Sequence, residues 1–331
     1  MDCAVSVASA SLDRDWDASR CRARRIVRSW LDIFIIFIIL KFFIQYYDYE
    51  SDFQQKILLQ RAYFSCRRHA MTKSTTYCSK TPNADGRYSY DAEETDVWGI
   101  LFNRQMETLR PFACRAYLDG QAKLGFSPDA VPQVADIDAR LAALTGAGVQ
   151  AVAALIPQDE FSTLLKNRRF PVATFIRRRE HLDYIEEPDI FHEVFGHCPM
   201  LTHPDFCRFM ERFGDLALSL PEPMLKRLFR LWWFTVEFGM IQEDGQMKAF
   251  GAGIMSSPSE AAHARDGVAD ILPFDLLTIF RTDYRIDIVQ PVYFAIDSFE
   301  QLAASLDDDI EGLLRQAAEM GDLPARFPAA A

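Results

Sequence analysis

The chain has 331 residues and carries 36 Lys and Arg against 47 Asp and Glu, a net charge of −11. This length allows one large domain or two small ones, with enough chain to bury a core. With 49% hydrophobic and 25% charged residues the composition is that of a globular protein, which excludes disordered, fibrous and multi-span membrane classes, and the acidic balance argues against a nucleic-acid binder.

The first 70 residues differ in charge from the rest of the chain. They hold 11 basic and 8 acidic residues, whereas residues 71–331 hold 25 and 39. A largely apolar run of 18 residues, 30–47, follows a cluster of arginines and is interrupted by Asp32 and Lys41. Three interpretations stay open for residues 1–70: a mis-assigned start with the protein beginning at Met71, a membrane anchor over 30–47, or another extension. We expect the folded domain over 71–331.

Helical periodicity dominates residues 71–331. Pro188 is suited to the first turn of one expected helix, and Thr145-Gly146 ends another. The expected helices cover, in chain order, residues 98–118 (broken only by Pro111), 136–144, 160–165, 188–197, 205–218 and 223–238.

Strand signals are brief. Residues 240–241 and 247–250 flank an Asp244-Gly245 pair suited to a tight hairpin turn, and residues 284–289 and 292–296 alternate weakly. No alternating series of strands and helices indicates a parallel sheet. The expected fold is therefore a mainly α single domain with short β ribbons.

Two of the six histidines, His192 and His197, lie five residues apart in an apolar stretch. This is not the H-E-x-x-H spacing of zinc proteases, which places both rings on one helical face. In a regular α-helix five steps of about 100° leave the rings about 140° apart. They can converge on one ion only if the helix ends or loosens near Gly196, for instance through a π-type turn. Metal binding and ordinary packing both remain open at this point.

Glu237 is the candidate third ligand. It stands among aromatic and β-branched residues with no other charge nearby, and a buried carboxylate is costly unless it is paired with a cation or a metal. A buried ion pair with an Arg is the alternative. Two His and one carboxylate with open coordination positions form the pattern of non-haem Fe(II) oxygenases.

Several long motifs, in order, carry a resemblance to a known family. They read NRRFPVATFIRRREHLDYIEEPDIFHEVFGH, WFTVEFG, GAGIMSSPSE and FRTDYRIDIVQPVYFAIDSF. Over roughly residues 85–300 the chain resembles the pterin-dependent aromatic amino acid hydroxylases, in particular the bacterial single-domain phenylalanine 4-monooxygenases. The resemblance implies a single hydroxylase-like catalytic domain in which His192, His197 and Glu237 bind Fe(II).

The resemblance also implies the substrate residues. Arg177 aligns with the arginine that grips the amino acid carboxylate, a task for which a planar guanidinium is suited. Trp233 and Phe238 match aromatic positions that hold the substrate ring, and Ser256 and Glu260 match positions that support the substrate and its arginine. Without the resemblance, a surface charge would be the default for Arg177 and core packing for the two aromatic residues.

For the tetrahydropterin, the resemblance implies backbone pairing along Ala154, Leu155 and Ile156. It also implies stacking on Phe161 and a nearby carboxylate, Glu193.

Some residues depart from the family pattern. Trp232 stands where the family usually has a tyrosine beside the iron site, which could change how water or oxygen is positioned. Ala154 replaces a usual glycine, a mild change because the contact is made by backbone. Ile185 and Cys198 replace residues that vary in the family. None of these departures removes a candidate iron ligand.

The expected function is hydroxylation of L-phenylalanine to L-tyrosine with Fe(II), tetrahydropterin and O2. Hydroxylation of tryptophan or tyrosine is the alternative within the family, and a zinc-dependent hydrolase or a non-enzymatic scaffold is the alternative outside it. The expected partners are the small-molecule substrate and the pterin, without nucleic acid, and with a membrane only if residues 30–47 are an anchor.

We expect a cytoplasmic monomer without a separate regulatory domain. Its seven cysteines show no C-x-x-C spacing and are expected to be reduced thiols.

Overall fold

The computed structural model describes residues 77–153, 156–185 and 187–327. The expectations for residues 1–70, including the apolar run 30–47, lie outside this range, and so do Ala154 and Leu155. The described residues belong to one compact unit, Lys73–Ala331. Among them, no helix is long and apolar enough to cross a membrane.

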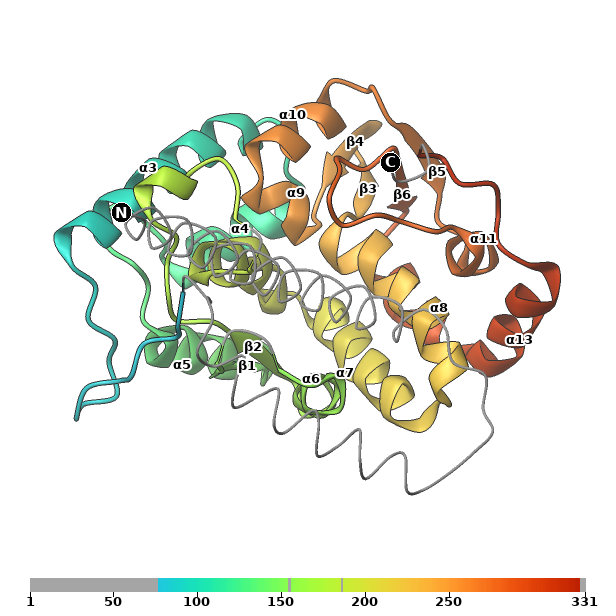
Figure 1. Ribbon diagram of the computed structural model, residues 1–331, viewed down its shortest axis with the longest axis horizontal. Coiled ribbons are helices and arrows are strands. Elements are labelled where there is room, and N and C mark those ends of the chain that lie inside the picture. Colours follow the sequence, from blue (N-terminus) through green and yellow to red (C-terminus); the bar gives the residue numbers. More distant parts are fainter. Residues whose placement is uncertain (1–76, 154–155, 186, 328–331) are drawn as a thin grey trace, which may run out of the picture. The chain divides into compact units, whose positions relative to one another are not determined.

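Helices build most of this unit (Figure 1). The α-helices are α3 (Ala92–Leu109), α4 (Arg115–Leu124), α5 (Val134–Thr145), α6 (Gln158–Lys166), α7 (Pro204–Ser219), α8 (Glu222–Trp232), α9 (Ala252–Ser256), α10 (Pro258–Arg265), α11 (Leu276–Arg281), α12 (Phe299–Ala304) and α13 (Ile310–Met320). Two π-helical segments, Phe191–His197 and Trp233–Glu237, and short 3₁₀ turns at Arg179–His181, Cys198–Thr202 and Ser305–Asp307 complete the helical part.

The helix starts follow local capping chemistry. Asp91 accepts a hydrogen bond from the Glu94 backbone N–H at 2.8 Å, and Glu94 accepts one from the Asp91 N–H at 2.9 Å, which forms a capping box. For this reason α3 begins six residues before the expected helix at residue 98. The chain then turns at Pro111 and continues as α4, as the proline predicts.

The strands form two small sheets that are more parallel than expected. β1 (Gly148–Ala151) pairs in parallel with β2 (Arg169–Val172), with Gly148 opposite Arg169. The second sheet has the order β4-β3-β6-β5, in which β3 (Met240–Glu243) pairs antiparallel with β4 (Gln246–Ala249), while β6 (Val292–Ile296) pairs in parallel with β3 and with β5 (Asp270–Pro273). The expectation that parallel pairing is absent is therefore wrong. The strands have only four or five residues, which is too short for the sequence to show a clear alternation of strands and helices.

The Asp-Gly hairpin is confirmed, whereas one expected strand is not present. Asp244 and Gly245 both have positive φ (51° and 75°), the conformation that a two-residue hairpin turn requires. Residues 284–289 form no strand in the structure. They make an irregular loop instead, and the buried Gln290 side chain closes it by donating to the carbonyls of Arg285 and Ile288, both at 2.9 Å.

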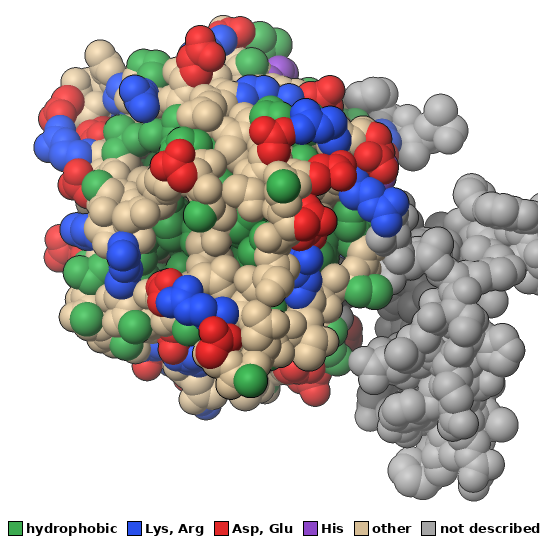
Figure 2. Space-filling model, turned by 90° about the vertical axis from the view of Figure 1, so that its left-hand side faces the viewer, with side chains coloured by type: hydrophobic (Ala, Val, Ile, Leu, Met, Phe, Trp, Pro, Cys, Tyr) green, Lys and Arg blue, Asp and Glu red, His purple; other side chains and the backbone are tan. Residues whose placement is uncertain are grey.

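An aromatic core holds the first π-helical segment in place. Phe191 and Phe195 stack on one another at 4.5 Å, and the edge-to-face contact of Trp98 with Phe191 (5.4 Å) ties them to α3. All three side chains are fully buried, and each such burial stabilises the fold by about 1.5–3 kcal/mol. By contrast, the face shown in Figure 2 carries basic and acidic side chains that are interspersed.

Candidate active site

Both segments that carry the candidate metal ligands are π-helical. The first π-helix, Phe191–His197, begins after Pro188 and Asp189 rather than at Pro188, which corrects the expected helix over 188–197. In the second segment the Phe238 N–H bonds to the Trp233 carbonyl five residues back, at 2.9 Å. Hydrogen bonds from i to i+5 bring residues five apart onto one face. This is the loosening that the spacing of His192 and His197 requires.

Three donor groups converge at these two segments. The Nε2 atoms of His192 and His197 are 3.2 Å apart, and the Glu237 carboxylate oxygens lie 3.6 Å and 3.5 Å from them. Two ligands bound to one ion at about 2.1 Å and at right angles lie about 3.0 Å apart. The three groups therefore fit a single first-row divalent ion. Glu193 offers a further carboxylate, within 4.8 Å of both imidazoles.

The position of the proton on His192 follows from its partner, Ser256 in α9. The Ser256 hydroxyl donates to the Ala252 carbonyl at 2.8 Å, so the same oxygen accepts from His192 Nδ1–H, also at 2.8 Å. His192 Nε2 is then left unprotonated and faces His197 and Glu237, which is the tautomer that a metal needs.

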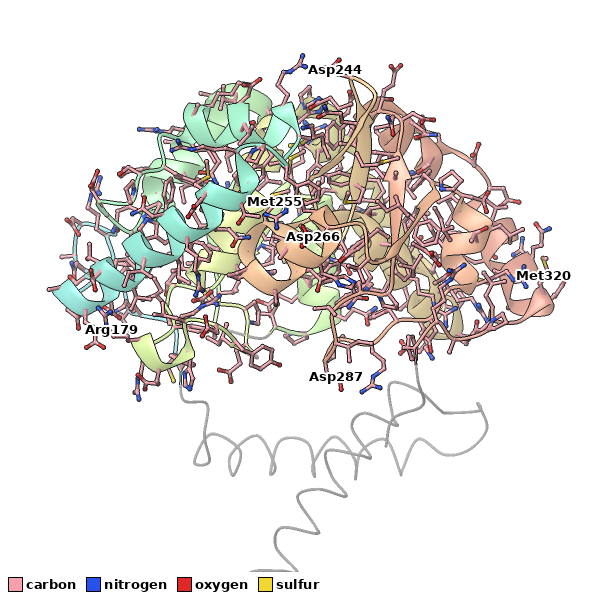
Figure 3. The ribbon with its side chains drawn as sticks, turned by 90° about the horizontal axis from the view of Figure 1, so that it is seen from above. Arg179, Asp244, Met255, Asp266, Asp287 and Met320 are labelled. Carbon is pink, nitrogen blue, oxygen red and sulfur yellow. The ribbon has the colours of Figure 1, made fainter. Side chains whose placement is uncertain are left out.

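α9 packs between the two π-helical segments. A side chain at Gly251, which precedes α9, would place its Cβ 2.5 Å from the Glu237 carbonyl oxygen, so only glycine fits there. Figure 3 shows where α9 lies: its buried Met255 is near the centre of the domain in this view, and Asp244 and Asp287 are at opposite edges. The GAGIMSS motif thus brings Ser256 to His192 and the backbone to Glu237.

Without an ion, burial favours the uncharged forms of these groups. It lowers the pKa of His192 to about 4 and that of His197 well below its usual value. It raises the pKa of Glu237 to about 7, and that of Glu193 well above its usual value, with the Glu237 and Asp189 carboxylates adding to the effect. A bound cation would reverse this preference for both carboxylates, because it supplies the opposite charge that they lack.

The Arg177 side chain is buried and forms an ion pair with Asp189, so it is not a surface charge. Asp189 accepts from Arg177 Nε at 2.8 Å, Nη2 at 2.9 Å and the backbone N–H at 3.0 Å. Asp189 also accepts from the His192 N–H at 3.1 Å. Burial alone would favour the uncharged forms of Arg177 and Asp189. Their attraction and hydrogen bonds to one another outweigh the effect of burial, so the pKa of Asp189 is lowered and that of Arg177 is raised. Two of the five guanidinium N–H donors are used in this way, and the remaining three can take a carboxylate.

Trp233 and Phe238 are in contact, with ring centroids 4.6 Å apart. The Trp233 indole stacks on Tyr284 at 4.3 Å, and its N–H donates to Gln290 Oε1 at 3.0 Å. Tyr284 and Gln290 were not expected at the site, although both lie in the 280–299 motif.

Glu260 lies next to this loop. Its Oε1 accepts from the Tyr293 hydroxyl at 2.6 Å and from the Gln290 N–H at 3.0 Å. The structure thus joins Glu260 to Gln290, whereas Arg177 has Asp189 as its carboxylate partner.

Of the residues expected to bind the pterin, the structure describes Phe161 in α6, the partly buried Ile156 and Glu193. The Phe161 ring contacts Trp232 edge-to-face at 5.2 Å. Trp232 in turn donates its indole N–H to Glu237 Oε1 at 3.0 Å. Trp232, the residue that departs from the family pattern, is therefore hydrogen-bonded directly to a candidate metal ligand. It links Phe161, which is expected to bind the pterin, with Glu237, which is expected to bind the metal.

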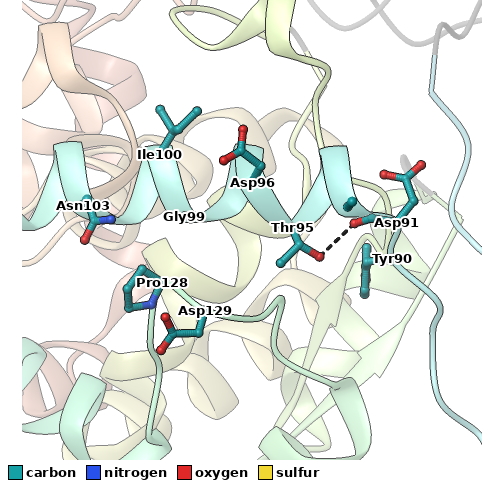
Figure 4. A pocket seen from close by; sticks show the side chains of 10 residues that line it. Tyr90, Asp91, Thr95, Asp96, Gly99, Ile100, Asn103, Pro128 and Asp129 are labelled. Atoms are coloured by element: carbon teal, nitrogen blue, oxygen red, sulfur yellow. Dashed lines mark hydrogen bonds between the residues drawn. The ribbon is translucent and has the colours of Figure 1, made fainter.

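A surface hollow of about 660 Å³ runs along α3 and contains none of the expected site residues. It is lined by Asp91, Asp96 and Asp129 among others (Figure 4). The hydrogen bond drawn there, from the Thr95 hydroxyl to the Asp91 carbonyl at 2.8 Å, belongs to the first turn of the helix. The hollow is therefore distinct from the candidate active site.

Comparison with known sequences supports the resemblance that the motifs indicate. The family of biopterin-dependent aromatic amino acid hydroxylases matches residues 40–317. A phenylalanine-4-hydroxylase of Vibrio cholerae is 45% identical over 262 residues, which cover 79% of this chain and 90% of that protein. The match supports the hydroxylase interpretation of the His/His/Glu set over the zinc-hydrolase one.

Known structures agree as well. The apo structure of the cold-active phenylalanine hydroxylase from Colwellia psychrerythraea superimposes with a TM-score of 0.75 at 40% identity, covering 77% of this chain and 100% of that one. The phenylalanine hydroxylase of Chromobacterium violaceum with bound oxidised Fe(III) gives 0.70 at 39% identity, covering 76% and 91%. This chain therefore belongs to the biopterin-dependent aromatic amino acid hydroxylases.

Proposed function

We propose that this protein hydroxylates L-phenylalanine to L-tyrosine, using O2 and a tetrahydropterin at an Fe(II) held by His192, His197 and Glu237. The observation that carries the proposal is the convergence of these three donors to within 3.2–3.6 Å of one another. Such a set occupies one face of an ion and leaves the other face open. When bound, Fe(II) and the reduced pterin supply the activation of O2 that protein side chains lack.

The protein's own part is to hold the amino acid. Arg177, fixed along one edge by Asp189, presents its free N–H donors to the substrate carboxylate, and such paired contacts set direction as well as affinity. Trp233 and Phe238 provide the apolar walls for the ring. Glu260 supports the Gln290 loop that holds Trp233. Because these groups are preorganised, the ring is held in position for the reaction.

The pterin stacks on Phe161 beside Ile156, with Glu193 close to the metal. Its backbone pairing is assigned to Ala154, Leu155 and Ile156, of which the first two lie outside the described residues. Support comes from the contact of Phe161 with Trp232, which is itself bonded to Glu237. Aromatic stacking would hold the pterin ring, and the apolar surroundings would keep bulk water from the reacting atoms.

The test is product analysis on the full chain, supplied with Fe(II), tetrahydropterin and O2 and, separately, phenylalanine, tryptophan and tyrosine. Chromatography should show tyrosine formed from phenylalanine, and only when pterin is present. Hydroxytryptophan as the main product would contradict the substrate assignment, and turnover without pterin would contradict the reaction.

We also propose that the protein is a cytoplasmic monomer. The buried Cys114, Cys198 and Cys207 are thiols that form no disulfide among the described residues, which suits a reducing compartment. Light scattering of the purified full chain should give the mass of a single chain, and cell fractionation should place it with the cytoplasmic proteins. A stable dimer or a membrane-bound fraction would contradict this.

A further inference from the structure

The turn between the two candidate histidine ligands contains an acceptor, the Phe195 carbonyl, that lacks its usual α-helical donor. In a regular helix the Phe195 carbonyl would accept from the N–H of residue 199. Residue 199 is proline, which has no N–H. Within its own helix only a bond of another period, such as the i to i+5 bond of a π-helix, could serve this carbonyl. A donor from another element therefore fixes it more firmly.

α4 supplies that donor. The Tyr117 hydroxyl, on a fully buried side chain, donates to the Phe195 carbonyl at 2.7 Å. Gln121, one turn later, donates its Nε2 to the Tyr117 hydroxyl at 2.8 Å and lies 3.4 Å from the same carbonyl. Burial raises the pKa of Tyr117 well above its usual value, so the hydroxyl keeps the proton that it donates.

The same helix is pressed closely against the turn. A Cβ at Gly120 would lie 2.2 Å from the Pro199 carbonyl oxygen, so α4 can approach this closely only with glycine at that position. Phe195 is followed directly by Gly196, whose backbone is the least restricted of any residue type, and then by His197. A fixed Phe195 carbonyl therefore limits how the His197 imidazole can be oriented.

We propose that Tyr117 is a positioning residue for the metal centre, whose hydroxyl replaces the N–H missing at Pro199 and so fixes the turn that brings His197 to His192 and Glu237. The inference rests on the proposed metal site and assigns a role to α4, which supplies no ligand. Groups that orient metal ligands typically change metal affinity by about 10- to 100-fold when they are removed.

The test is Co(II) binding to the full chain and to Tyr117→Phe, which removes only the hydroxyl. Titration followed by visible absorption should show affinity at least about tenfold weaker in the variant, with altered Co(II) bands. The matched control is Tyr90→Phe, which loses a hydroxyl-to-carbonyl bond of 2.8 Å to Thr174 and should bind Co(II) like the parent protein. Urea unfolding of the metal-free proteins separates loss of affinity from loss of fold.

Two further variants keep the proposal falsifiable. Pro199→Ala returns an N–H at position 199, so Tyr117→Phe combined with Pro199→Ala should recover most of the affinity. Gln121→Met removes the bond to the Tyr117 hydroxyl but keeps that hydroxyl, so its Co(II) affinity should lie between those of the parent protein and Tyr117→Phe. If Tyr117→Phe does not fold, parent-like Co(II) affinity in Gln121→Met overturns the inference.

Parent-like Co(II) affinity and bands in Tyr117→Phe would overturn the inference, as would equal weakening in Tyr90→Phe. A double variant as weak as Tyr117→Phe would overturn the role given to Pro199. Failure of the parent protein itself to bind Co(II) would instead count against the proposed metal site.

Discussion

Replacing Trp232 with Phe removes one donor from the candidate metal carboxylate and little else that is polar. The indole N–H donates to Glu237 Oε1 at 3.0 Å, while the other carboxylate oxygen lies 3.6 Å from His192 Nε2. The Trp232 ring is buried against Phe161 and Phe213. Phenylalanine keeps an aromatic ring in this position but cannot donate a hydrogen bond.

The magnitude follows from the chemistry of that bond. A hydrogen bond to a charged group contributes about 1.5–3 kcal/mol. Since about 1.4 kcal/mol corresponds to a factor of ten, its loss should weaken Fe(II) binding roughly 10- to 100-fold. The smaller ring also leaves a cavity, which lowers the free energy of unfolding whether or not metal is present.

Anaerobic calorimetry with Fe(II) on the full chain measures this effect. The matched control is Phe213→Leu, which loosens the same aromatic cluster, 5.0 Å from Trp232, but keeps the indole N–H. We expect a stability loss in both variants and an affinity loss only in Trp232→Phe. Unchanged Fe(II) affinity in Trp232→Phe, or an equal loss in Phe213→Leu, would refute the reasoning.

Three other variants give further expected outcomes. Ser256→Ala removes the acceptor for His192 Nδ1–H, so iron retained after dialysis, measured by mass spectrometry, should fall while circular dichroism is unchanged; full retention would contradict the tautomer argument. Arg177→Lys loses the planar fork that bonds Asp189 twice along one edge and leaves three donors for a substrate carboxylate, so steady-state kinetics should show KM for phenylalanine rising at least about tenfold, with a smaller change for the pterin. In Asp322→Asn the pH dependence of urea unfolding should change: bonds from the α8 arginines hold the pKa of Asp322 at about 2, below its usual 3.8, so its stabilising effect is complete above about pH 4 and is lost as the pH falls through 2. The stability gap between parent and variant should therefore close over that range, and a constant gap would contradict the ion-pair assignment.

Local sequence signals were sufficient for the hairpin and for the existence of the helices expected up to residue 238, whereas α9 to α13 were not expected and α3 begins six residues early. The Asp244-Gly245 turn and the break at Pro111 depend on one or two residues, and both were predicted at the right positions. The spacing of His192 and His197 was also sufficient to require a loosened turn. The parallel pairs of β6 were not predictable in this way, because their partners lie far apart in the sequence.

The supporting residues of the site depend on long-range packing. Asp189 lies within a quoted motif, but only the fold shows that its carboxylate binds Arg177 and the His192 N–H together. Tyr117 is 78 residues from Phe195, and the missing N–H of Pro199 is the sequence signal that could have prompted a search for a donor. The sequence therefore indicated the ligands better than the groups that orient them.

The metal centre itself is tested most directly by iron content. The full chain and the variants His192→Ala, His197→Ala and Glu237→Gln would be loaded anaerobically with Fe(II), desalted and measured by mass spectrometry, with circular dichroism to verify the fold. We expect one iron per parent chain and a loss of bound iron in each variant, together with loss of tyrosine formation. A folded variant that keeps its iron would contradict the assignment of that residue, and a parent chain that binds none would contradict the account as a whole.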